Sequence, residues 1–155
     1  MPPDRQARLQ ELGLELPDVP EPAGAYVPAP RAGNRIFTAG QLPLEAGELL
    51  TTGKVGDAVS EEEAYRAARL CALNALAAAA TEAGGLDRIH RVVKVTGFVA
   101  SAPGFNAQPQ VLNGASDLIG QVFGEAGLHA RSAVGVAELP LDAPVEVEIV
   151  AELEA

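Results

Sequence analysis

The sequence is short of several residue types, and each shortage excludes a class of protein. Its 155 residues include one cysteine, no tryptophan and 4% aromatic residues. A single cysteine cannot form an internal disulfide, and so few aromatics leave little on which nucleic-acid bases could stack. No apolar run approaches the ~18–20 residues of a membrane span. The N-terminus also lacks the charged and then apolar pattern of an export signal, so we expect a cytoplasmic protein without a membrane partner.

Basic residues and recognised catalytic motifs are scarce as well. Eleven Lys and Arg residues face 21 Asp and Glu residues, which gives a net charge of −10. Without a basic cluster such a surface repels phosphate backbones, so nucleic acid is not an expected partner. No G-x-G-x-x-G, P-loop, C-x-x-C or G-x-S-x-G motif occurs, which leaves nucleotide, redox and serine-hydrolase chemistry unsupported. His90 and His129 lack partners at metal-ligand spacing, so no metal site is predicted.

The distribution of proline and apolar residues divides the chain into an N-terminal arm and one domain. Residues 1–22 contain five prolines, which fix φ and remove backbone donors. We expect this segment to be an extended arm with a short helix near residues 4–13. Residues 23–155 are long enough for a single domain with its own core.

Local patterns predict the order of elements in that domain. Residues 25–28 and 35–39 read as short strands around a turn at 31–34, and residues 44–52 as a small hairpin. Ser60 and Glu63 form a capping box at the start of a long helix that Gly84 ends. One stripe of that helix carries small residues, which indicates close packing on a sheet: Ala64, Ala67, Cys71, Ala75 and Ala78. We expect the single thiol to be buried and structural.

The second half of the chain adds a strand over residues 90–100, a helix that begins near Pro109, and two further strands after His129. The order is typical of an α+β domain, with one mixed sheet and two helices packed on one face. The uncovered face of the sheet keeps apolar and small groups among its charges, so we expect it to be buried in a closed ring of subunits.

The two C-terminal strands read as a hairpin that holds Arg131 and Glu148 within reach of each other. A guanidinium presents a planar donor fork that matches a carboxylate bidentately, and a nearby glutamate could position a water. A cross-strand ion pair is the commoner explanation of the same pattern. From the spacing alone, both readings stay open.

At these residues the sequence resembles the RidA/YjgF family of enamine and imine deaminases, some members of which carry an endoribonuclease (L-PSP) description. The resemblance covers residues 23–153 in consistent order. The segments that carry it are 25–27, 33–43, 91–99, Asn113 in the second long helix, and above all 130–148. The sequence departs from the family at three positions, where Ala133, His129 and Ala39 replace a common cysteine, proline and serine.

The resemblance implies a chorismate-mutase-like fold, a homotrimer with clefts between subunits, and a reaction without a cofactor. That reaction is the hydrolysis of reactive 2-enamine or 2-imine acids, such as 2-aminoacrylate, to 2-keto acids and ammonia. The small-molecule substrate would be bound by Arg131 through its carboxylate, and Glu148 would hold or activate the water. The remaining substrate-binding residues implied by the family are Tyr26, Gly40, Asn113 and Ala133.

Two other functions use the same residues. A trimer that binds a small carboxylate without turnover would need the same Arg131. Endoribonuclease activity is the third possibility, and the net charge of −10 and the absence of a basic groove argue against it.

Overall fold

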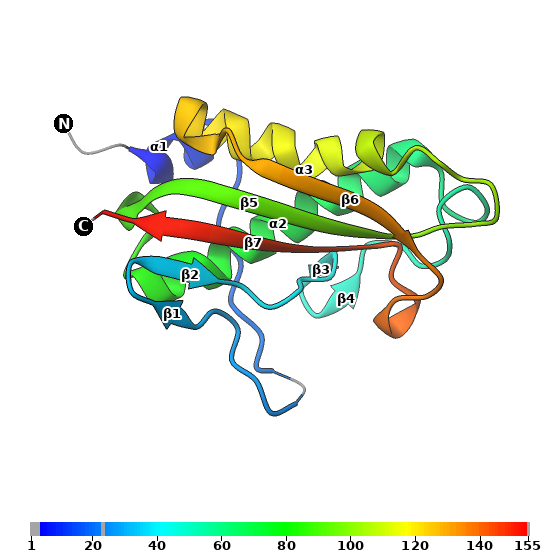
Figure 1. Ribbon diagram of the computed structural model, residues 1–155, viewed down its shortest axis with the longest axis horizontal. Helices are drawn as coiled ribbons and strands as arrows, with labels where there is room; N and C mark the ends of the chain where they lie inside the picture. Colours follow the sequence, from blue (N-terminus) through cyan, green and yellow to red (C-terminus); the bar gives the residue numbers. More distant parts are fainter. Residues whose placement is uncertain (1–3, 23, 155) are drawn as a thin grey trace.

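The fold is described from a computed structural model, which covers residues 4–22 and 24–154. Its helices are α1 (Arg5–Glu11), α2 (Glu61–Ala83) and α3 (Gln108–Phe123), with short 3-10 turns η1 (Leu86–Arg88), η2 (Gly124–Gly127) and η3 (Pro140–Asp142). Its strands are β1 (Arg31–Ala32), β2 (Arg35–Phe37), β3 (Leu44–Glu45), β4 (Glu48–Leu49), β5 (Ile89–Ala100), β6 (Ala130–Val136) and β7 (Val145–Leu153). The α+β class, the mixed sheet and the helices on one face are confirmed (Figure 1).

The main sheet has the order β1-β2-β7-β5-β6, and only the β5–β6 pair is parallel. The expected C-terminal hairpin is therefore wrong, because β5 lies between β6 and β7. Local alternation shows which residues share a face of a strand, but it does not specify the neighbouring strand. At 12 residues, β5 is the longest strand and pairs along both edges.

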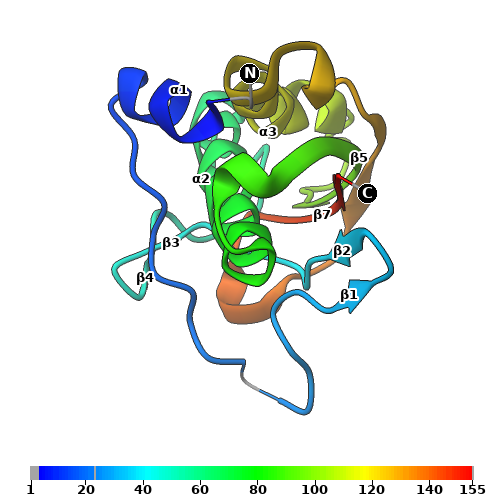
Figure 2. The same ribbon diagram turned by 90° about the vertical axis from the view of Figure 1, so that its left-hand side faces the viewer.

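Helices α2 and α3 lie side by side on one face of the sheet (Figure 2). The small-residue stripe of α2 is buried as predicted, and Cys71 within it is fully buried. Burial raises the pKa of that thiol well above its ordinary value, which suits a structural side chain rather than a nucleophile. The two helices approach closely at Gly114 of α3, where a Cβ would lie 2.0 Å from the Tyr65 carbonyl oxygen.

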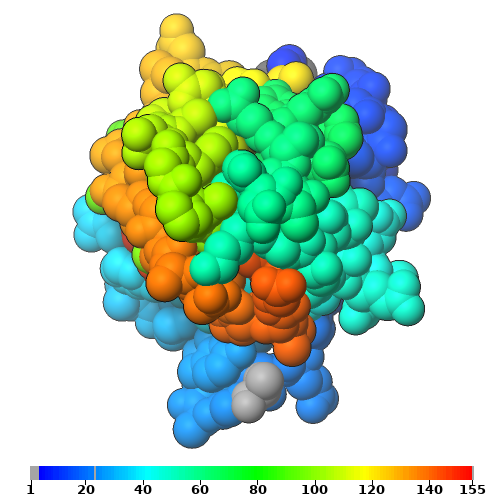
Figure 3. All heavy atoms as spheres, turned by 90° about the vertical axis from the view of Figure 1, so that its right-hand side faces the viewer, coloured from blue at the N-terminus to red at the C-terminus, as the bar shows by residue number. Residues whose placement is uncertain are grey.

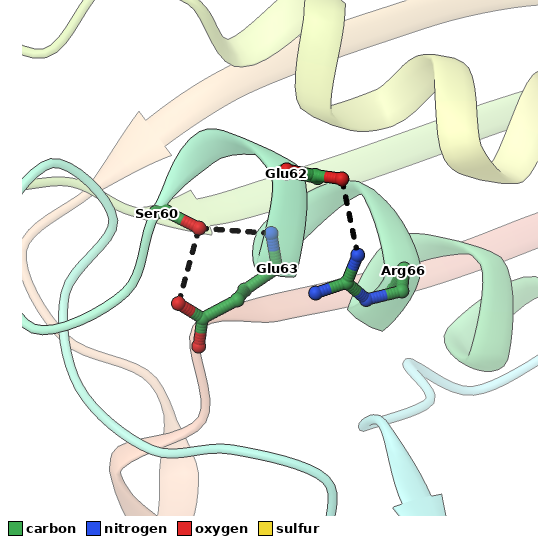
Figure 4. Close-up of polar contacts among 4 residues, drawn as sticks. All are labelled: Ser60, Glu62, Glu63 and Arg66. Atoms are coloured by element: carbon green, nitrogen blue, oxygen red, sulfur yellow. Dashed lines mark hydrogen bonds and ion pairs between the residues drawn. The ribbon is translucent and has the colours of Figure 1, made fainter.

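The start of α2 is fixed by the predicted cap (Figure 4). The Ser60 hydroxyl accepts the Glu63 N–H at 3.1 Å and donates to the Glu63 carboxylate at 3.1 Å. One turn further, Arg66 and Glu62 form an exposed ion pair at 3.4 Å. Gly84 adopts φ +89° and ends the helix, as its lack of a Cβ allows.

The N-terminal third differs from the sequence prediction at one strand. The helix near residues 4–13 and the 44–52 hairpin are confirmed as α1 and the β3–β4 pair. Residues 25–28 form no strand, so that prediction is wrong. Instead β1 occupies Arg31–Ala32, inside the expected turn, and pairs with β2 around Gly33 at φ +64°. The turn therefore consists of residues 33–34 and is two residues shorter than the predicted turn at residues 31–34.

The sheet face opposite the helices is uncovered in the single chain. Phe37 on β2 and Val134 on β6 are each 43% exposed there, and Phe98 and Val150 between them are half-buried. None of the helices in the described parts of the chain is long and apolar enough to cross a membrane. Exposed apolar side chains on a sheet face that its own helices do not cover are typical of a protein–protein interface.

Candidate functional site

Arg131 is held on the helix-facing side of β6 by two side chains of α3. Its Nη1 donates to Asn113 Oδ1 at 2.9 Å and to Ser116 Oγ at 3.1 Å. Residues three apart share a helix face, so Asn113 and Ser116 together fix one nitrogen of the guanidinium. Ala133 follows two residues later and therefore points to the same face of β6. This arrangement, the Arg131 cluster, orients a cation at the edge of the sheet.

A second cluster forms where residues 38–41 run beside β7. The Thr38 N–H donates to the Ile149 carbonyl at 3.0 Å, and Gln41 exchanges two backbone hydrogen bonds of 2.8 and 3.0 Å with Val147. Between these anchors lies Gly40, directly against the Glu146 side chain. A Cβ on Gly40 would lie 2.2 Å from Glu146 Oε2. The absence of a side chain at Gly40 therefore allows the carboxylate to occupy this position, and a larger residue would displace it.

The Glu146 carboxylate and Gly40 open into a cavity of about 390 Å³ that Tyr26 also lines. Burial, and after it the neighbouring charge of Glu148, raise the pKa of Glu146 above its ordinary value. A half-buried carboxylate with a raised pKa beside a cavity is a typical candidate for proton transfer. These residues form the second cluster, which we call the Glu146 cluster.

The structure brings some of the predicted site residues together and separates others. Arg131, Asn113 and Ala133 share one cluster, and Tyr26 and Gly40 share the other. Glu148 lies two residues beyond Glu146 on the open face of the sheet, in register with Thr96. It is not among the residues that line the cavity.

The two clusters are far apart within one chain. Strand β5 separates β6 from β7, which places the two strands roughly 10 Å apart at the usual strand spacing. Arg131 also faces the helices, because it is in register with the buried Val95, whereas Glu146 is in register with Phe98 and faces the open side. A single chain therefore keeps the two clusters apart.

Sequence reasoning did not select Glu146 or Ser116. Glu146 and Glu148 occupy equivalent positions of the strand alternation, so the pattern cannot choose between them. Only the approach of Gly40, in the segment that runs beside β7, decides which carboxylate meets the cavity. Ser116 had a signal, since its spacing of three from Asn113 places both on one helix face.

Known proteins share the sequence and the fold of this chain. Residues 6–153 match the family model described as "YjgF/chorismate mutase-like, putative endoribonuclease". The chain belongs to this family. The sequence-based assignment to RidA/YjgF and its chorismate-mutase-like fold is thus confirmed. Family members include imine deaminases, and others carry endoribonuclease names.

Individual relatives cover nearly the whole chain. Protein TCP17 of Trypanosoma cruzi is 47% identical over 148 residues, which are 95% of this chain and 92% of that protein. A 2-iminobutanoate/2-iminopropanoate deaminase of Dermatophagoides farinae is 30% identical over 91% of this chain and 95% of its own length.

Solved structures extend the comparison. Atu1372 of Agrobacterium tumefaciens, described as of unknown function, has a TM-score of 0.89 at 48% identity and covers 97% of this chain and 92% of its own. Escherichia coli TdcF, solved with bound serine, has a TM-score of 0.65 at 25% identity and covers 88% of this chain and 94% of its own. The structures of this family thus point to the binding of small molecules.

Proposed function

We propose that this protein hydrolyses 2-imino acids, and the 2-enamine acids that tautomerise to them, to 2-keto acids and ammonia. The observation that carries the proposal is the pair of complementary clusters, one with an oriented cation and one with a half-buried carboxylate beside a cavity. Each lacks what the other supplies. The related deaminase of Dermatophagoides farinae acts on the same class of substrate by its name.

We propose further that the clusters meet between subunits of a homotrimer. The uncovered sheet face carries Phe37 and Val134, each 43% exposed, and burying them on another chain removes apolar area from water. A ring also allows the same two surfaces to meet at every interface. The Arg131 cluster of one chain would then face the Glu146 cluster of its neighbour, and Tyr26 and Asn113 would approach each other across the cleft.

In the assembled cleft Arg131 binds the substrate carboxylate through the nitrogens of its fork, while Asn113 and Ser116 hold Nη1 in place. A guanidinium matches a carboxylate bidentately. The backbone beside Ala133 contributes further hydrogen bonds to the substrate. C2, which carries both the carboxylate and the imine nitrogen, then faces Glu146 of the neighbouring chain.

Glu146 acts on the water rather than on the substrate. As a carboxylate it takes a proton while the water oxygen bonds to C2 and the C=N π electrons move to nitrogen. The protonated Glu146 returns this proton to the nitrogen, which gives a carbinolamine with a hydroxyl and an amino group on C2. Glu146 then takes the hydroxyl proton and passes it to the amino nitrogen, the C2–N bond breaks to release ammonia, and the C2–O bond becomes the carbonyl of the 2-keto acid. Water is the only co-reactant, so the reaction needs no cofactor. A raised pKa suits a group that both accepts and donates near neutral pH.

The sequence-based prediction gave this role to Glu148, and paired variants separate the two candidates. Glu146→Gln and Glu148→Gln make the same chemical change two residues apart on one strand. We expect Glu146→Gln to lose ~100-fold or more in kcat, as is typical for removal of a general base. Glu148→Gln retains kcat within a few-fold. The reverse result would assign the water to Glu148.

The proposal is tested by measuring ammonia and 2-keto acid release from imino acids that an amino-acid oxidase generates in situ. The wild type is compared with Arg131→Ala and with Arg66→Ala, which removes the same charge from an exposed ion pair on α2. We expect acceleration over spontaneous hydrolysis by the wild type and Arg66→Ala only. If the Arg131→Ala variant sediments at the same rate as the wild type, its assembly into oligomers is unchanged.

The same experiment decides between this reaction and its rivals. Tight 2-keto acid binding without any acceleration would favour a carboxylate-binding trimer, a function that the serine-bound TdcF structure also suggests. RNA cleavage that disappears in Arg131→Ala would favour the endoribonuclease name of the family. A net charge of −10 opposes the latter.

A further inference from the structure

The cavity beside Glu146 has a second wall, which comes from the N-terminal arm. Residues 19–22 line it on one side, and residues 40–42, Leu44 and η3 line it on the other. Figure 3 shows the orange-red η3 segment directly beside the blue surface of the N-terminal region. The arm thus reaches the same space as the carboxylate proposed to act on water.

Contacts with the rest of the domain anchor the arm from its start to Val19. At its start, Arg8 donates from Nε and Nη2 to the Gln121 carbonyl, both at 3.0 Å, and Leu9 is fully buried. Further along, Leu14, Leu16 and Val19 pack against the core. Figure 2 shows the arm descending beside the β3–β4 hairpin. Prolines at 17, 20 and 22 restrict the backbone of the arm up to and within the wall, which lowers the entropy cost of ordering it around a ligand.

The opposite wall is also anchored. Asn74 of α2, 8% exposed, donates its Nδ2 to the carbonyls of Leu42 and Leu44, both at 3.0 Å. Leu141 of η3 adopts φ +59° and is 69% exposed at the cavity. A positive φ is unusual for leucine, and here it holds an apolar side chain at the cavity rather than in the core.

The lining is apolar apart from a few groups, and its charged members have one sign. Among the described residues that line the cavity, Glu21 and Glu146 are the two that carry a charge, and none is a Lys, Arg or His. A second carboxylate on a ligand would find no cation there and would be repelled by both glutamates. An aliphatic side chain would instead contact Val19, Pro20 and Leu141.

We propose that the arm is a specificity wall, and that it selects 2-imino acids with aliphatic side chains over those with small or acidic ones. This inference rests on the proposed function, because it places the reacting carbon at Glu146. The side chain of the substrate then extends from C2 toward residues 19–22. Val19 and Glu21 are the residues that set the preference.

The test compares imino acids that an amino-acid oxidase makes from leucine, alanine and glutamate. We expect the wild type to prefer the leucine-derived substrate in kcat/KM by ~10-fold or more over each of the others. Val19→Ala lowers the ratio of kcat/KM for the leucine-derived substrate to kcat/KM for the alanine-derived substrate about 10-fold. Glu21→Lys raises kcat/KM for the glutamate-derived substrate about 10-fold, a gain that misfolding cannot produce.

Glu15→Lys is the matched control, since it makes the same charge change on the arm outside this cavity. Turnover of all three substrates without preference, unchanged by Val19→Ala and Glu21→Lys, would overturn the inference and leave the proposed function standing. If no substrate turns over, calorimetry with the corresponding 2-keto acids replaces kinetics. Tighter binding of the branched keto acid that depends on Val19 supports the wall, and equal binding of all three refutes it.

Discussion

Gly40→Ala tests the central contact of the site with the smallest possible change. The added Cβ would lie 2.2 Å from Glu146 Oε2, and an ordinary van der Waals separation begins near 3.4 Å, so the carboxylate must move by about 1.2 Å. Gly40 is not among the glycines with positive φ. Alanine therefore fits its backbone, and the displaced carboxylate is the main consequence.

A displacement of about 1 Å in a catalytic group can cost on the order of 100-fold in rate, which corresponds to about 2.7 kcal/mol of barrier. We expect Gly40→Ala to lower kcat/KM for imino acid hydrolysis by that amount. The free energy of unfolding should change by less than ~1 kcal/mol, because the Glu146 side chain is flexible and can move aside. Steady-state ammonia release and thermal unfolding measure the two quantities.

Gly120→Ala on α3 is the control, since a Cβ there meets nothing within 4 Å. It should leave kcat/KM unchanged and raise stability by up to ~1 kcal/mol through helix propensity. The decisive measurement is a double-mutant cycle. In a Glu146→Gln background, the addition of Gly40→Ala should lower kcat/KM little further. Full activity of the single Gly40→Ala variant would refute the assignment of the water to Glu146.

Three further predictions concern the charge of Glu146 and the close approach of α2 and α3. Glu148→Gln removes a like charge that raises the pKa of Glu146, so the acid limb of the kcat/KM profile should shift to lower pH, whereas Glu152→Gln should not move it. Because the folded chain binds a proton at Glu146 more tightly than the unfolded chain does, its stability falls as pH rises from about 4.5 through the raised pKa. Glu146→Gln should therefore raise the melting temperature at pH 7 and change it little at pH 4. Gly114→Ala places a Cβ 2.0 Å from the Tyr65 carbonyl oxygen, and separating α2 from α3 should cost ~1–3 kcal/mol in urea unfolding; an unchanged midpoint would contradict the close approach.

Much of the fold could be predicted from the sequence, because its signals are local. The cap at Ser60, the stop at Gly84 and the small-residue stripe of α2 each act within a few residues, and all are confirmed. The pairing of strands was not predictable in the same way. β6 and β7 follow each other in the chain, yet both pair with β5, which ends 30 residues before β6 begins and 45 residues before β7 begins.

The candidate site shows the same division. The helix-facing cluster could be expected in part, since Arg131 and Asn113 were both selected from the sequence and are hydrogen-bonded. Glu148 was chosen from the family resemblance and from its expected reach to Arg131 in a C-terminal hairpin, and the hairpin is wrong. Glu146 and Glu148 differ in no local property of the sequence. They differ in their tertiary contacts, because Gly40, more than 100 residues earlier in the chain, lies against Glu146.

Because the proposed site is divided into two clusters, the proposed reaction depends on association of chains through the open sheet face. Arg131 and Glu146 project to opposite faces from strands that β5 separates, so no side-chain rearrangement within one chain can join them on a small substrate. Association through the open sheet face would bury Phe37 and Val134 and bring a second copy of each cluster to the first. The apolar area that stabilises the ring would then also create the cleft, and the arm would close it from outside. A variant that keeps the fold but prevents association should therefore lose the reaction even though it retains every side chain of the site.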